Sequence, residues 1–353
     1  MSGTTSFHAT MSKSSVLEGI AMSTLSRRQF NRVAAVMSLG LAGFSPSKGR
    51  AAEVFPAKPI RLVVPWPVGG ATDVIARVLA EKLTGKIGQS VIVDNRAGAT
   101  GYIGTQNVLQ SKPDGYTLLL MAASVHSFSP SVMKTMPFNP VADFLPISLI
   151  TTFPYVMVVP ANSPYKSAAD IIAAAKSRPG KVAFGSFGTG SAPHLISELF
   201  ALNSGVKLLH VPYKGGSQAL TDLLGGQYDF LIDSLPSPLP QIRAGKLKAL
   251  AVTSAKRAAA VPDVASLAET IPGFDAISWL GIGGAANLPG PVADRIFSAI
   301  REITIDPDYG RKLRAIGAEP LSSNSPDAFR SFLVTEKNRW AKVVSDANIP
   351  KVE

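Results

Sequence analysis

The chain of 353 residues contains no cysteine, which excludes disulfide bonds, thiolate metal sites and cysteine nucleophiles. Charged residues are also few, at 17% of the chain, whereas 46% of the residues are hydrophobic. This composition is typical of a compact globular protein and not of a disordered one. Because a single hydrophobic core rarely serves more than about 250 to 300 residues, the length predicts two lobes.

Long hydrophobic runs are missing as well. The uncharged, mostly apolar stretch at 33–44 is shorter than the roughly 20 residues that cross a membrane, and no later stretch is long enough. It follows the pair Arg27-Arg28 and precedes small residues that end at Ala52. This order is typical of a twin-arginine export signal. We therefore expect residues 1–52 to be an upstream extension plus a signal peptide cleaved near Ala52, and the mature protein to be soluble and periplasmic.

Either of two methionines can be the first residue of that signal. Met22 stands where a signal of ordinary length would begin, which leaves Met1 and Met22 as alternative starts. A cytosolic protein with a chance arginine pair is the other interpretation of the same stretch.

Catalytic signatures are also lacking. The sequence has no Gly-x-Ser-x-Gly elbow, no His-Glu-x-x-His, no Walker A loop and no Gly-x-Gly-x-x-Gly, and its four histidines stand far apart along the chain. A serine hydrolase built on Ser186 or Ser191 with His210 would still need an acid partner. We therefore expect a protein that is not an enzyme and that uses neither a metal nor a cofactor.

The net charge is positive but dispersed. It is +11 for the whole chain, and for the part after residue 52 it is 29 − 23 = +6. Lysines and arginines stand singly, without runs or interleaved aromatic residues, so a nucleic-acid surface is disfavoured and a mild attraction for small anions is favoured.

Short β-branched runs alternate with helical stretches from Pro59 onward, which predicts an α/β fold whose mostly parallel sheet is flanked by helices. The expected strands are 60–64, 91–93, 116–121, 155–160, 182–184, 208–211 and 228–232. The expected helices are 72–83, 168–176, 193–202, 217–224 and an amphipathic last helix that begins at Ser325-Pro326.

Two loops that join a strand to the next helix share one chemistry. The first runs from Pro65 to Asp73 and the second from Gly185 to His194, and both are rich in glycine and hydroxyl residues. Ligands of open α/β sheets bind beyond the carboxyl ends of the strands, where unpaired amides at a helix N-terminus can hold an anion without a cation. The sequence thus predicts a carboxylate site between these loops.

Other strand ends add candidates, for each of which a structural role is the alternative. Asp73 is as suited to capping its helix as to touching a ligand, and His194 to a hydrogen bond within the protein. Trp66 would wall the pocket or cover the lobe surface, and for Asp233 we favour holding backbone amides. The ligand-binding candidates are Trp66, Val68, Gly69, Gly70, Ala71, Thr72, Asp73, Ser124, Ser186, Gly188, Thr189, Gly190, Ser191, His194, Tyr213 and Asp233.

Seven stretches in order resemble the substrate-binding receptors of tripartite tricarboxylate transporters, the Bug-type extracytoplasmic solute receptors. They are PWPVGGATD at 65–73, DNRAGATG at 94–101, PDGYTL at 113–118, GTGSAPHL at 188–195, VPYKGG at 211–216, DLLGG at 222–226 and AGKLKAL at 244–250. The chain departs from the family pattern at Trp66, where a Phe or Tyr is usual, and at the glycine-rich run 281–287.

The resemblance implies a two-lobed type II periplasmic binding protein fold that closes on its ligand like a Venus flytrap. Lobe one would comprise 53–152 and 278–353, and lobe two 153–277. The family grips a carboxylate between the two loops through backbone amides, hydroxyls and water, and delivers it to membrane transporter subunits. A receptor that reports to a membrane sensor protein is the alternative. We expect a monomer that binds a small organic carboxylate and no nucleic acid.

Overall fold

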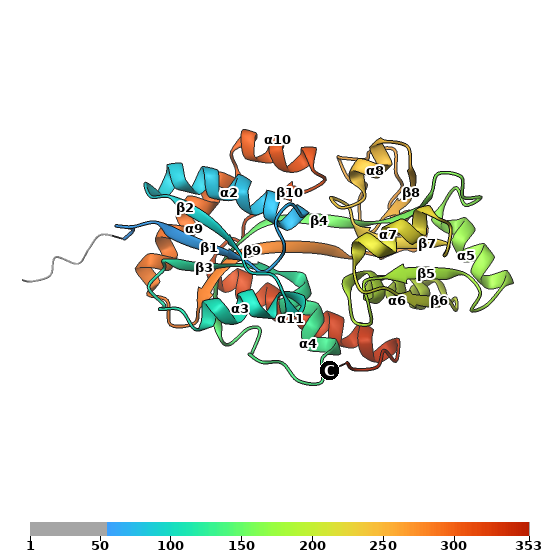
Figure 1. Cartoon of the computed structure of the whole chain (residues 1–353), viewed down its shortest axis with the longest axis horizontal. Coiled ribbons are helices and arrows are strands. Elements are labelled where there is room, and N and C mark those ends of the chain that lie inside the picture. Colours follow the sequence, from blue (N-terminus) through green and yellow to red (C-terminus); the bar gives the residue numbers. More distant parts are fainter. Residues whose placement is uncertain (1–54, 353) are drawn as a thin grey trace, which may run out of the picture. The chain divides into compact units, whose positions relative to one another are not determined.

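The computed structural model describes residues 55–352, so the predicted signal, its cleavage near Ala52 and the choice between Met1 and Met22 lie outside the described residues. Strands and helices alternate along the chain (Figure 1). The strands are β1 (Ile60–Val64), β2 (Val91–Asn95), β3 (Thr117–Ala122), β4 (Phe144–Pro160), β5 (Ala183–Ser186), β6 (Leu209–Pro212), β7 (Phe230–Ser234), β8 (Leu247–Val252), β9 (Ile277–Ala285) and β10 (Glu319–Pro320).

The helices include short 3₁₀ and π segments. They are α2 (Ala71–Ile87), η1 (Ala99–Gly101), α3 (Tyr102–Leu109), η2 (Ser124–Phe128), α4 (Ser129–Val132), α5 (Ala168–Ser177), α6 (Ala192–Ser204), α7 (Gly216–Leu224), α8 (Leu239–Arg243), η3 (Leu267–Glu269), α9 (Gly290–Thr304), α10 (Pro307–Ala315) and α11 (Pro326–Asp346). Ser325 caps α11, as its sequence predicts, by accepting a hydrogen bond from the amide of Ala328. Within residues 55–352 no helix is long and apolar enough to cross a membrane.

One mixed sheet connects all the strands, in the order β2-β1-β3-β9-β4-β7-β5-β6, with β8 and β10 paired to β4. Parallel pairs occur toward both ends of this order, where β1 pairs with β2 and β3, and β5 pairs with β6 and β7. The antiparallel pairs involve the long central strands β4 and β9. The predicted α/β fold is confirmed.

The central strand β4 changes partners along its length. Residues 144–154 pair with β9, and residues 155–160 pair with β7 and β8. We call the strands on the β9 side the first half of the sheet and those on the β7 side the second half. Only 155–160 was predicted as a strand, because Pro146 and Pro154 argue against one. Register shifts next to Pro146 and between Leu149 and Thr151 accommodate the irregular stretch.

Strand β9 also escaped prediction, because glycine weakens a strand pattern. A Cβ at Gly281 would collide with the ring of Phe329, and a Cβ at Gly283 with the side chain of Met121. The glycine-rich run therefore lets α11 and β3 pack closely against β9.

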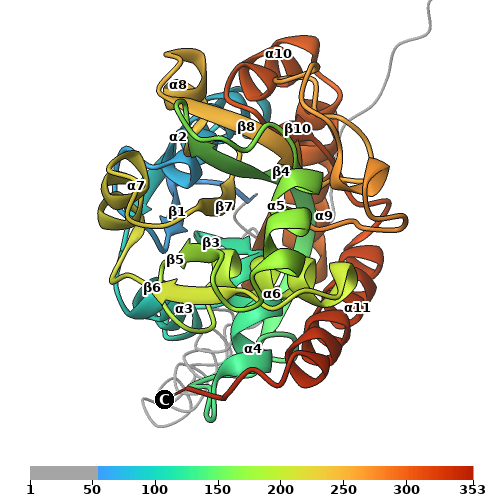
Figure 2. The same cartoon turned by 90° about the vertical axis from the view of Figure 1, so that its right-hand side faces the viewer.

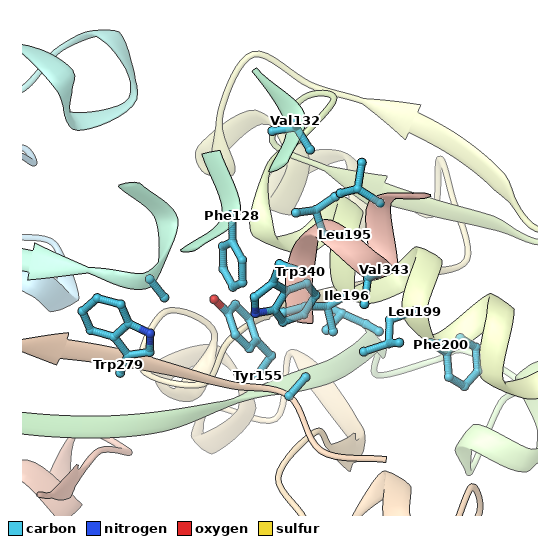
Figure 3. Close-up of a cluster of buried hydrophobic side chains, with 14 of the residues drawn as sticks. Phe128, Val132, Tyr155, Leu195, Ile196, Leu199, Phe200, Trp279, Trp340 and Val343 are labelled. Atoms are coloured by element: carbon cyan, nitrogen blue, oxygen red, sulfur yellow. The ribbon is translucent and has the colours of Figure 1, made fainter. Parts of the chain in front are cut away.

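A hydrophobic cluster spans both halves of the sheet and includes Phe128 after β3, Leu195 on α6 and Trp340 on α11. Figure 3 shows these side chains packed together, with Tyr155 of β4 beside them. Helix α11 contacts η2, α4 and α6, and Figures 1 and 2 show it running beside α4. The last helix thus touches elements from both halves.

Candidate functional site

The two glycine-rich loops are directed toward each other by the sheet itself. Strand β1 is parallel to β3, which is antiparallel to β9, which is antiparallel to β4, so β1 runs in the direction of β4. Strand β5 is parallel to β7, which is antiparallel to β4, so β5 runs against β4. Because β1 lies in the first half and β5 in the second, their carboxyl ends both point toward the middle of β4 (Figure 1).

The ends of β3 and β7 both lie near the middle of β4. The last residue of β3, Ala122, is opposite Leu280, which in turn is opposite Thr151 of β4, while Asp233 of β7 is opposite Val156 of β4. The strand pairing therefore brings the loops after β1, β3, β5 and β7 to one region, as the sequence predicts for a ligand site.

In the loop after β1, the buried carboxylate of Asp73 ties the loop to its helix. Its Oδ2 accepts hydrogen bonds from the Gly69 amide at 3.0 Å and from Arg77 Nε at 3.0 Å, and its Oδ1 accepts one from Asn95 Nδ2 at 3.0 Å. Burial raises the pKa of Asp73, but the hydrogen bonds from Arg77, Gly69 and Asn95 outweigh it, so the pKa lies below its ordinary value. The carboxylate is thus ionised and fully engaged within the protein.

Backbone amides at the start of α2 have no capping side chain. Gly70 is the N-cap of α2 and provides no side-chain cap, so the amides of Ala71 and Thr72 begin the helix without an intrahelical acceptor. Gly70 itself is exposed, and a Cβ there would have only the Pro67 carbonyl oxygen nearby, at 3.7 Å. This end of α2 has the donors and the positive dipole that an anion requires.

Beside this helix end, Trp66 and Val68 form the outer part of the loop. Trp66 is half-buried next to Gly101, and its carbonyl oxygen accepts a hydrogen bond from Asn95 Nδ2 at 3.1 Å. Val68 is 69% exposed, which is unusual for a valine in a tightly turned loop. Asn95 thus holds both the loop and Asp73, a role that sequence reasoning missed although Asn95 falls in one of the family-like stretches.

The loop after β5 uses several of its own amides internally. The amide of Gly188 donates to Ser186 Oγ at 3.1 Å, that of Gly190 donates to His194 Nδ1 at 3.0 Å, and that of Ser191 donates to the Gly188 carbonyl at 3.1 Å. Thr189, between them, is exposed. The loop therefore offers fewer free amides than its glycine content suggests.

Two histidines lie under this loop with their rings stacked. The centroids of His194 and His210 are 4.0 Å apart at an interplanar angle of 15°, and Phe184 stacks on His210 at 5.0 Å. His210 Nε2 shares a hydrogen bond of 2.6 Å with Ser186 Oγ. Burial, and for His194 also the neighbouring His210, lowers the pKa of His194 to about 4, and burial lowers that of His210. Both rings are consequently neutral at neutral pH.

The remaining candidates occupy strand ends. Ser124 begins η2, and its carbonyl accepts a hydrogen bond from Ser129 Oγ at 2.8 Å. The amide of Tyr213 donates to the Ser186 carbonyl at 2.9 Å, which joins the loop after β6 to the loop after β5.

Asp233 is 6% exposed and serves its own backbone. Its Oδ1 accepts the Ser234 amide at 2.7 Å, in agreement with the backbone role favoured from sequence. Burial raises its pKa to about 6 despite hydrogen bonds from Ser237 and Ser234. A buried carboxyl group of this kind can be neutral or charged close to neutral pH.

With this geometry described, comparison with known proteins defines the class. Residues 75–349 match the family model described as "Tripartite tricarboxylate transporter family receptor". Protein BugT of Bordetella pertussis is 38% identical over 317 residues, covering 89% of this chain and 97% of BugT.

Two solved structures of Rhodopseudomonas proteins are also similar. R. palustris Rpa4515 with adipate is 35% identical with a TM-score of 0.77, over 84% of this chain and 100% of that one. MatC from Rhodopseudomonas palustris with bound malate is 27% identical with a TM-score of 0.71, over 82% of this chain and 100% of MatC.

The chain belongs to the tripartite tricarboxylate transporter receptor family and is an extracytoplasmic solute receptor. The resemblance inferred from the seven sequence stretches is confirmed. A solute receptor is not a class of enzyme, which agrees with the expectation from the missing catalytic motifs.

Proposed function

We propose that this receptor captures a small organic anion through a carboxylate held between the loops after β1 and β5, and delivers it to tripartite tricarboxylate-type membrane transporter subunits. The observation that carries the proposal is the convergence of two glycine-rich loops, each followed by a helix N-terminus, on the middle of β4. The adipate and malate in the titles of two similar structures are both dicarboxylates, which supports this ligand class.

We assign different roles to the candidate residues. The amides at the start of α2, together with the exposed Thr189 and with Ser191, whose hydroxyl donates to the Gly188 carbonyl at 2.7 Å, would contact the ligand. Trp66 and Val68 would border it. Asp73 and Asp233 would act as scaffold, because their oxygens already accept backbone amides. An anion would be repelled by either carboxylate if it were directed at the ligand.

The change of partner along β4 supports the predicted lobes. Residues up to Pro154 belong to the first half of the sheet and residues from Tyr155 to the second. We propose this point, and Ile277 opposite it on β9, as the hinge between lobe one (53–152 and 278–353) and lobe two (153–277). A ligand bound at the middle of β4 would contact both lobes and favour closure.

An exported hydrolase is the second candidate, because Ser186 Oγ and His210 Nε2 are 2.6 Å apart. However, Ser186 is fully buried and its Oγ already accepts the Gly188 amide. No carboxylate is paired with His210 in the described part of the chain. We therefore favour a structural role for this pair, in keeping with the receptor family.

Calorimetry of the purified mature protein with mono-, di- and tricarboxylates tests the proposal. We expect one-to-one binding of at least one dicarboxylate, weakened tenfold or more by Gly70→Val, because the new side chain would cover the exposed start of α2. Gly85→Val is the matched control, since a Cβ there also meets open space but lies on the far part of α2. Absence of binding across the panel, or heat from turnover, would contradict the proposal.

A further inference from the structure

The stacked rings of His194 and His210 come from two different elements and reach two different points of one loop. His194 is on the first turn of α6, and His210 is on the edge strand β6. His194 Nδ1 accepts the Gly190 amide, and His210 Nε2 meets Ser186 Oγ, which in turn accepts the Gly188 amide. Both glycines have positive φ angles, 109° at Gly188 and 82° at Gly190, so the loop between them is tightly turned.

We infer that the His194–His210 stack is the positioning element of the loop 186–191: it holds the amides of Gly188 and Gly190 inward and thereby turns the remaining loop donors toward the ligand. The inference rests on the proposed function for what the loop binds, but its structural part does not depend on any ligand. His210 was not among the ligand-binding candidates from sequence. Under this inference it acts only through its hydrogen bond with Ser186.

The chemistry of the two rings fits this task. A neutral imidazole has one donor and one acceptor nitrogen, so acceptance of the Gly190 amide at Nδ1 requires the proton of His194 to be on Nε2. That nitrogen faces Glu198 Oε1 at 3.7 Å, which favours the same tautomer. The pKa of His194, lowered to about 4, keeps Nδ1 free of a second proton at neutral pH.

Packing leaves the loop little freedom to move away from the stack. Phe184 covers His210 from below at 5.0 Å between centroids, and a Cβ at Gly190 would lie 2.8 Å from Val132 of α4. The rings and Val132 therefore enclose the Gly190 end of the loop, and the nitrogen acceptors decide which way its amides point. A phenylalanine at 194 would fill the same space but leave the Gly190 amide unpaired, and one at 210 would remove the partner of Ser186 Oγ, the atom that accepts the Gly188 amide.

Two pairs of variants distinguish the effect of the ring nitrogen from the effect of the ring itself. His194→Phe and His210→Phe keep an aromatic ring and remove the acceptor, whereas His194→Asn and His210→Gln replace Nδ1 and Nε2 by amide atoms at similar positions. His126→Phe is the control, because His126 is also a buried histidine but contacts Phe144 and lies outside the loop.

The first measurement is nuclear magnetic resonance of the ligand-free protein. We expect the wild type to show His194 as the neutral Nε2–H tautomer, and the Gly190 amide to exchange with solvent about tenfold faster in His194→Phe but near the wild-type rate in His194→Asn. We expect the Gly188 amide to respond in the same way to His210→Phe and His210→Gln. The Nδ1–H tautomer of His194, or unchanged exchange in both phenylalanine variants, would overturn the inference.

The second measurement is affinity for the dicarboxylate found in the calorimetric panel. Both phenylalanine variants should bind about tenfold more weakly, with recovery in the Asn and Gln variants and no change in His126→Phe. Equal affinity of all variants would overturn the link to the ligand. If the wild type binds no carboxylate at all, the proposed function fails, while the tautomer and the amide exchange still decide the role of the stack.

Discussion

At the scale of single residues, Asp73 and Asp233 show how this protein uses buried carboxylates. Each follows or borders a strand end in the candidate site, and each accepts a backbone amide, from Gly69 and from Ser234. The two differ in the direction of the pKa shift: hydrogen bonds keep Asp73 ionised, whereas burial dominates at Asp233. Near the candidate anion site, the charge of Asp73 is thus balanced by hydrogen-bond donors, whereas burial disfavours the charged form of Asp233.

Replacing Asp73 tests the scaffold role. In Asp73→Ala the Gly69 amide and Asn95 lose their acceptor in a site where Asp73 is 2% exposed, so we expect the free energy of unfolding to fall by about 2 to 3 kcal/mol. The ion pair with Arg77 adds little, because Arg77 is half-exposed. Urea denaturation measures the change.

A surface residue on the same helix, Glu81, provides the control for that experiment. Glu81→Ala removes an exposed contact with Lys312 and should change the unfolding free energy by less than about 1 kcal/mol. A loss in Asp73→Ala no larger than that in Glu81→Ala would show that the carboxylate does not hold the loop.

At the scale of elements, the sequence predicts well wherever local pattern and burial agree. The helix expected at 168–176 is α5 (Ala168–Ser177), and the last helix begins at its predicted cap, Ser325. The sequence-based predictions miss β9 and most of β4. In β4 the prolines are accommodated by register shifts, and in β9 the glycines allow close packing against Phe329; both are tertiary effects that local pattern does not show. The site loops were likewise located from local pattern, but the roles of Asn95 and His210 arise from contacts across strands.

Helix α11 offers the element-scale prediction. Trp340 is fully buried, packs edge-to-face on Phe128 with centroids 4.5 Å apart, and donates from Nε1 to Glu336 at 3.2 Å. We expect Trp340→Ala to reduce the unfolding free energy by about 3 to 5 kcal/mol, because a large cavity would open where α11 meets both halves of the sheet. Val334→Ala, at a 39% exposed position of the same helix, should cost less than about 1 kcal/mol. Similar effects of the two variants in denaturant titrations would contradict the bridging role of α11.

At the scale of the whole molecule, the cluster that includes Phe128, Tyr155, Phe184 and Trp340 joins both halves of the sheet into one hydrophobic core. Loss of structure in one half would expose part of the other, so the described chain should unfold as one unit. The unfolding free energy of the chain should then depend on every buried titratable group, in whichever half of the sheet that group lies.

The pH dependence of this stability follows from three histidines, Asp233 and Glu198, because burial shifts the pKa of each; that of Glu198 is raised. The pKa of His126 and of His194 is lowered to about 4, and that of His210 is also lowered, so between pH 6.5 and pH 4 the unfolded chain binds protons that the folded protein does not, and the folded state is destabilised. Asp233, with its pKa raised to about 6, acts in the opposite direction over the same window, because the folded state takes up its proton first.

Three histidines outweigh the two carboxyl groups Asp233 and Glu198, so we expect the unfolding free energy to be lower at pH 5 than at pH 7.5, with His126 alone contributing on the order of 2 kcal/mol. Urea titrations at the two pH values measure the difference. His126→Phe should make it smaller, since the unfolded chain loses one proton site, and Asp233→Asn should make it larger, since the opposing group is removed. Equal or greater stability at pH 5 would show that the buried histidines accept protons in the folded protein, and would also contradict the neutral His194 on which the loop arrangement depends.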